Sequence, residues 1–156
     1  APERWRILGG KALGCFLTIL MLASVVLLVG RLGFGVRPAS FPLLVASLLS
    51  ISFAFVGVMM AISTLGKTQA AVSGLGWAIL MMMNMTGGGM VPLAFMPAWM
   101  QSAGSVSPVK WAILSLEGSM WRGFSAEQML LPCGILLAVG AVGLTIGVRA
   151  FRWNEA

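Results

Sequence analysis

The sequence predicts an all-α integral membrane protein. Of its 156 residues, 59% are hydrophobic and only 9% are charged, and the mean hydropathy is +0.98. A soluble domain of this size exposes a large share of its residues to water, so it could not bury so much apolar surface. Lipid is therefore the expected surrounding of most of the chain.

Charged residues divide the chain into uncharged windows that are long enough to cross a bilayer. Asp, Glu, Lys and Arg are absent from windows of 19, 29, 42 and 21 residues. A bilayer core of about 30 Å needs roughly 20 helical residues. We therefore expect four transmembrane helices, at about 12–30, 41–65, 70–88 and 129–148.

The 42-residue window is too long for one crossing, because as a single helix it would reach about 63 Å, twice the bilayer core. Its second half carries Pro92, Pro97 and Pro108, and each proline removes a backbone donor. Broken helices persist at membrane depth where protein or a water-filled cavity surrounds them. The pattern predicts a re-entrant helical hairpin over about 92–121.

The net charge of +6 does not indicate a nucleic-acid partner, because the basic residues stand singly or in pairs at the window edges and form no stripe. Such positions suit anchoring at a membrane surface. Three basic residues precede the first window, which predicts a cytoplasmic amino end. The basic count is 6 against 4 whether the long window crosses once or twice, so charge does not test the hairpin.

Enzymatic and metal chemistry find no support in the sequence. It contains no histidine, and its two cysteines, Cys15 and Cys133, lie inside apolar windows, where they are expected to be small hydrophobes. The GKT at 66–68 lacks the upstream glycine of a phosphate-binding loop. We expect no cofactor and no metal to be bound by this chain.

The segment MMMNM in the third predicted span is the candidate cargo contact. Methionine is flexible and polarizable, and it suits promiscuous apolar surfaces; packing or lipid contact is the alternative. Asn84 is the amide of this span, which indicates either a helix–helix hydrogen bond or a place in a pathway. The candidate pathway residues are Met81, Met82, Met83, Asn84 and Met85.

Three glycines follow, where the third span meets the predicted hairpin. Glycine tolerates backbone conformations that a side chain forbids, so they could form a bend in a gate or simply begin a loop. The candidate gate and hairpin residues are Gly87, Gly88, Gly89, Pro92, Pro97, Trp99, Pro108 and Trp111. Earlier in the same span, the small-xxx-small spacing in Ser73, Gly74, Trp77 and Ala78 predicts close packing against another helix.

One ordered set of motifs resembles a known family. The chain reads PERWRILGGK, then GKTQAA, then GGGMVPLAFMPAWMQ and then SVSPVKWAILSLEGSMWRG, with the predicted spans between these motifs and a last span after them. This order is similar to that of the ABC-2 type permeases, the membrane subunits of ABC exporters, over nearly all 156 residues. The resemblance implies a six-span half-transporter that pairs with a second permease half, identical or different, under an extracellular hairpin.

The same resemblance places ATP and Mg on a separate ABC ATPase subunit. It also implies that the four predicted spans are the last four of six. The sequence begins without methionine, and we expect that the first two spans and most of the coupling helix that docks on the ATPase precede it.

The sequence thus predicts the permease subunit of an ATP-driven exporter in the cell inner (plasma) membrane, forming a pathway for a hydrophobic or amphipathic cargo such as a drug or lipid-like molecule. It predicts a transport subunit and no enzyme. The alternative is a non-transport membrane scaffold or sensor, which would have neither an ATPase partner nor polar residues facing a cavity.

Overall fold

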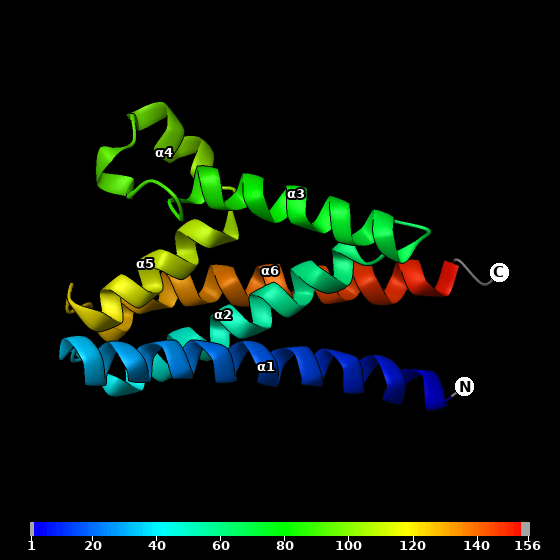
Figure 1. Cartoon of the computed structure of the whole chain (residues 1–156), viewed down its shortest axis with the longest axis horizontal. Helices are drawn as coiled ribbons and strands as arrows, with labels where there is room; N and C mark the ends of the chain where they lie inside the picture. The colour runs from blue at the N-terminus through cyan, green and yellow to red at the C-terminus, as the bar shows by residue number, and fades with distance from the viewer. Residues whose placement is uncertain (1, 154–156) are drawn as a thin grey trace.

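The computed structural model describes residues 2–153, and within them it contains helices and no strand (Figure 1). Four of the helices are long and apolar enough to cross a membrane, which confirms the predicted all-α membrane class. In chain order the elements are α1 (Pro2–Phe34), α2 (Phe41–Ile62), α3 (Gln69–Gly87), the 3-10 turn η1 (Leu93–Phe95), α4 (Ala98–Gly104), α5 (Pro108–Met120) and α6 (Ala126–Trp153).

The helix ends follow local capping chemistry. The Thr68 side chain accepts a hydrogen bond from the Ala71 amide at 3.2 Å and so begins α3. Helix α2 ends three residues before the predicted Leu65, where the Ser63 and Thr64 hydroxyls donate to carbonyl oxygens of the preceding turn. Helix α1 has 33 residues, about 50 Å, so it extends well beyond the apolar window.

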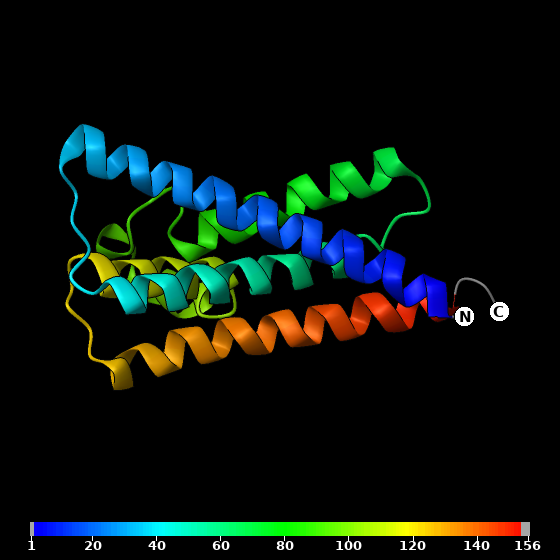
Figure 2. The ribbon, with the colours of Figure 1, turned by 90° about the horizontal axis from the view of Figure 1, so that it is seen from below.

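The long helices run lengthwise through the bundle (Figure 1). Residues 2 and 153 lie at one end, and the loops at 35–40 and 121–125 lie at the other, together with α4. Helix α2 is central: near the 35–40 loop it lies between α1 and α6 (Figure 2).

The most extensive contact in the bundle joins α2 to α6 through glycines. A β-carbon at Gly57 would collide with the Gly140 carbonyl oxygen, and one at Gly143 would collide with the backbone of Gly57. At Gly147 it would lie 3.0 Å from the Met60 β-carbon. Small residues let helix backbones approach closely, so these glycines set the distance between α2 and α6.

The close packing predicted for the start of the third span is wrong within this chain. A β-carbon at Gly74 would meet no described atom of another element within 4 Å, and Ser73 and Ala78 are exposed. Only Gly76 on this part of α3 is buried, against Ile62. A small-residue pattern indicates that a close approach is possible, but the partner helix decides where it occurs.

Hydrogen bonds fix α5 to the rest of the bundle. The Ala39 and Ser40 amides donate to the Met120 and Ser119 carbonyl oxygens at 3.0 and 3.2 Å. Deeper in the bundle, the fully buried Ser47 hydroxyl of α2 donates to the Ser115 carbonyl oxygen at 3.1 Å. Helix α5 also packs against α6, so it forms a continuous unit with α2 and α6.

Candidate functional site

The candidate pathway residues occupy the last turns of α3, and they do not share one environment. Met82 and Met85 are 68% and 50% exposed, and Asn84 is exposed too. Met81 and Met83 are half-buried. Among the described residues the Asn84 side chain makes no hydrogen bond, so the helix–helix bond considered for it is not formed within this chain.

An apolar groove lies beside α3 on the side of α2 and α6, with a volume of about 570 Å³. Met83 is its α3 residue. The remaining lining comes from α2 and the turn after it, and from one face of α6 that includes Ile135, Val139 and Val142. Nothing in the sequence indicated that α6 would share a groove with the methionine segment, because these residues are about 50 positions apart.

A second groove, of about 710 Å³, lies between α1, α2 and α3. Phe55, Met59 and Leu80 supply apolar walls, and Lys11, Cys15 and Thr18 line it from α1. Helix α3 is thus bordered by two mainly apolar grooves. Such surfaces select ligands by shape and hydrophobicity, since few polar groups are present to fix an orientation.

The three glycines after the methionines have different structural tasks. A β-carbon at Gly87 would lie 2.7 Å from the Val109 β-carbon, so α3 ends in direct contact with α5. Gly88 has φ +93, the left-handed conformation that favours glycine and ends the helix. A β-carbon at Gly89 would lie 2.6 Å from the Asn84 Oδ1 atom. The predicted bend is therefore a tightly packed helix end.

The three hairpin prolines each stand at the start of a short helix. Pro92 and Pro97 immediately precede η1 and α4, and Pro108 is the first residue of α5. Proline is favoured at these positions, because the first amide of a helix has no partner within the helix. The predicted helix breaks at these residues are confirmed. The short helices η1, α4 and α5 all lie within the range of about 92–121 predicted for the hairpin.

Polar contacts hold α4 against α5. The Lys110 ammonium group donates to the Gln101 carbonyl oxygen and to the Ser105 hydroxyl, both at 2.8 Å. The Trp111 indole N–H donates to the Ser105 carbonyl oxygen at 2.9 Å. Trp99 is 72% exposed, so the two candidate tryptophans have different surroundings.

A second set of contacts joins the hairpin to α3. The Ser107 hydroxyl donates to the Met83 carbonyl oxygen at 2.9 Å, and a β-carbon at Gly104 would collide with the Thr86 carbonyl oxygen. The structure therefore brings the methionine segment, Gly87 and the start of α5 together. Ser107 and Gly104 were missed as candidates; their position in a Gly/Ser-rich stretch between two prolines was the only sequence signal.

The charged residues nearest the hairpin form one ion pair among the described side chains, between Arg122 and Glu117 at 2.9 Å. Within the described residues no cluster of three or more His, Cys, Asp or Glu side chains could hold a metal ion. The two grooves beside α3 are lined mainly by apolar side chains.

Comparison with known proteins identifies the family of the chain. The ABC-2 type transporter family model matches residues 3–121. The linearmycin resistance permease protein LnrN of Bacillus subtilis (strain 168) is 29% identical over 153 residues, which cover 96% of this chain and 39% of that relative. The chain thus spans about two fifths of the relative's length. No solved structure matches the chain.

The matched residues include α1, α2, α3 and the whole hairpin, and four helices of the chain are long and apolar enough to cross a membrane. Membership of this family agrees with a multi-pass membrane protein. The chain belongs to the ABC-2 type transporter family.

Proposed function

We propose that this chain forms part of the translocation pathway of an ATP-driven exporter for hydrophobic or amphipathic molecules, such as drugs or lipid-like compounds. The observation that carries the proposal is the pair of apolar grooves, about 570 and 710 Å³, that border α3. Drug-sized ligands occupy pockets of about 300–1,000 Å³. The similarity to a resistance permease agrees with export of such molecules.

In this proposal the cargo contacts the α3 end. Met83 lines one groove, while Met82 and Met85 project from the exposed face and contact cargo once a second permease half encloses it. Asn84 supplies the hydrogen-bonding group of that face. Thioether side chains adapt to molecules of different shape, which fits a pathway with a broad cargo range.

The α4–α5 hairpin is the proposed gate, a re-entrant element on the extracellular side. Its contact with α3 through Ser107 and Gly87 links gate position to the cargo-binding turns. The amino end of this chain then faces the cytoplasm of a cell whose inner (plasma) membrane holds the protein. The four long helices are the last four of a six-span permease.

Energy comes from a partner in this mechanism. GKT at 66–68 lies in the turn between α2 and α3, where Thr68 caps a helix, so we assign ATP and Mg to a separate ABC ATPase subunit. Nucleotide binding there shifts the permease halves between inward-facing and outward-facing arrangements. Only a difference in binding between two states can drive such a shift.

The experiment is purification of the full-length protein that contains this chain from native membranes, followed by an assay of ATP hydrolysis. The expected result is a co-purifying ATPase whose turnover changes when apolar cargo is added to reconstituted vesicles. Repeated recovery without any ATPase would instead support a scaffold or sensor. An ATPase whose turnover no apolar cargo changes would contradict the proposed cargo class.

A further inference from the structure

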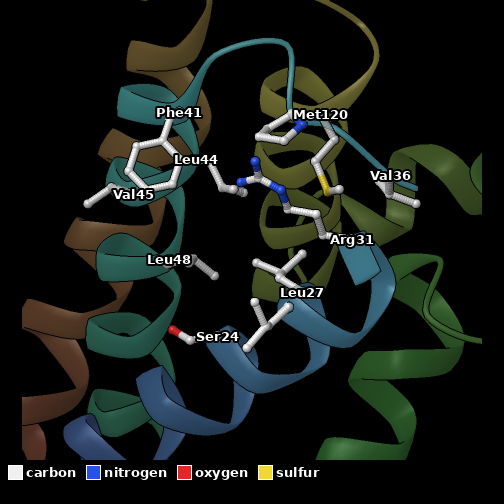
Figure 3. Close-up of a pocket in the computed structure, with 11 residues that line it drawn as sticks. Ser24, Leu27, Arg31, Val36, Phe41, Leu44, Val45, Leu48 and Met120 are labelled. Carbon is white, nitrogen blue, oxygen red and sulfur yellow. The ribbon is translucent and has the colours of Figure 1, made fainter. Parts of the chain in front are cut away.

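A separate cavity lies at the end of the bundle that holds the 35–40 loop, between the last turns of α1 and the first turns of α2 (Figure 3). Its volume is about 250 Å³. The walls are mainly apolar: Leu27 comes from α1, Leu44 and Leu48 come from α2, and Met120 comes from α5. None of its residues lines either groove beside α3.

Two polar side chains line this cavity, and only one of them is available to a ligand. The Ser24 hydroxyl donates to the Leu20 carbonyl oxygen of its own helix at 2.7 Å. The Arg31 side chain makes no ion pair and no hydrogen bond among the described residues. Figure 3 shows it extending from α1 toward the start of α2, so its guanidinium donors lie at an apolar cavity without a protein acceptor.

Nearby charges leave Arg31 unneutralised. Glu117, at the end of α5, is paired with Arg122 at 2.9 Å. Arg37, in the following loop, is a further exposed cation. Arg31 lies in the last turn of α1, where the partial negative charge of the helix end favours a cation. No carboxylate among the described residues pairs with its guanidinium group, so an anionic ligand can supply the full negative charge.

We propose that an anionic phospholipid of the surrounding bilayer binds here, with its phosphate on Arg31 and one acyl-chain segment in the cavity. Arg31 follows the apolar window of a membrane-spanning helix, which places it at the depth of lipid headgroups. A guanidinium matches a phosphate with two parallel hydrogen bonds. The cavity is smaller than the usual pocket of about 300 Å³ or more for a compact ligand, so it suits part of a chain.

The test uses the full-length protein in phosphatidylcholine vesicles that contain a small fraction of a phosphatidylglycerol analogue with a photoreactive acyl chain. We expect cross-links in peptides that contain Leu27 and Leu44. In Arg31→Gln these cross-links should fall about fivefold, the effect of one basic residue at an anionic membrane surface. Arg37→Gln, which removes a cation outside the cavity lining, is the matched control and should leave them unchanged.

A second variant, Ser24→Trp, fills the cavity from α1 and keeps the charge. It should reduce the same cross-links, and it decides the matter if Arg31→Gln does not fold. Equal labelling by a phosphatidylcholine analogue would overturn the proposal, as would equal losses in Arg31→Gln and Arg37→Gln. Labelling by a free fatty-acid probe that excess phosphatidylglycerol cannot displace would also overturn it.

Discussion

The Ser107 hydroxyl donates a hydrogen bond of 2.9 Å to the Met83 carbonyl oxygen, across a sequence separation of 24 residues. This bond joins Ser107, the residue immediately before α5, to the last turns of α3. Gly87 packs against Val109 in the same place, and Gly104 packs against the Thr86 carbonyl. A displacement of the hairpin is therefore expected to shift the turns of α3 that carry the candidate pathway methionines.

Replacing Ser107 with alanine should destabilise this junction. The variant loses the bond to Met83 and the cap on the Val109 amide, together about 1–2 kcal/mol. Thermal unfolding of the purified full-length protein measures the loss. Ser102→Ala is the control, because the Ser102 hydroxyl bonds only to the Ala98 carbonyl oxygen of its own helix. Equal melting temperatures for the two variants would show that the junction contributes nothing.

The α2–α6 contact predicts a sharp difference between two glycines of α6. Gly143→Leu places a side chain against the Gly57 backbone, and overpacking of this kind costs about 1–3 kcal/mol or more. Gly134→Leu is the matched control, because a β-carbon there meets no described atom of another element within 4 Å. The yield of monodisperse protein and its resistance to denaturant should fall only for Gly143→Leu. A comparable fall for Gly134→Leu would contradict the packing described.

Gly88 provides a test of the gate. Gly88→Trp should reduce export while membrane insertion remains intact, because φ +93 disfavours any side chain and the Leu93 side chain is 2.9 Å from the β-carbon position. Gly88→Ala should cost about 1–2 kcal/mol. Gly123→Ala carries the same kind of backbone strain, at φ +62, in the loop after α5. Unchanged export in Gly88→Trp would remove the gate role, and equal export losses in both alanine variants would reduce it to general stability.

Lys110 is expected to control the mobility of α4. Lys110→Met removes the two bonds of 2.8 Å that tie α5 to Gln101 and Ser105 but keeps an unbranched side chain. Hydrogen exchange of the amides in residues 101–107 should then become faster by about tenfold, for a loss near 1.4 kcal/mol. Lys67→Met, in the exposed turn before α3, should leave this exchange unchanged. Identical protection in both variants would exclude a restraining role for Lys110.

Alanine substitutions at the methionines of α3 can distinguish a role in cargo contact from a role in packing. Alanine at Met82 or Met85, which are largely exposed, should change the relative export of different apolar cargoes by several-fold without lowering stability. Alanine at the half-buried Met83 should lower stability as well, as buried methionine truncations do. A uniform loss for every cargo in all three variants would assign the segment to packing.

The positions of the helices were predictable because charge and proline act locally. Uncharged windows marked the four long helices, and Pro92, Pro97 and Pro108 marked the starts of the short ones. Residue-level placement was harder. The sequence could show that Met83 and Asn84 share a helix, but their different exposure depends on which neighbours the helix receives.

Helix pairing was not predictable, because it depends on surfaces far apart in the sequence. The small residues near Gly74 resemble those near Gly143, yet only the latter meet another backbone. The groove beside Met83 needs α6, and the Arg31 cavity needs Met120 from α5. The spacing of residues within one span does not indicate which residues of other spans will lie beside them.

The glycine contact between α2 and α6 also sets an order of events during synthesis. Helix α2 leaves the ribosome long before its main partner α6, since α3, η1, α4 and α5 are all made between them. Until residue 126 and those after it enter the membrane, Gly57 lacks the Gly140 and Gly143 backbone against which it packs in the finished fold. The final packing of the bundle therefore requires the last helix. A chain that stops at residue 121 is expected to enter the membrane without forming the α2–α6 contact.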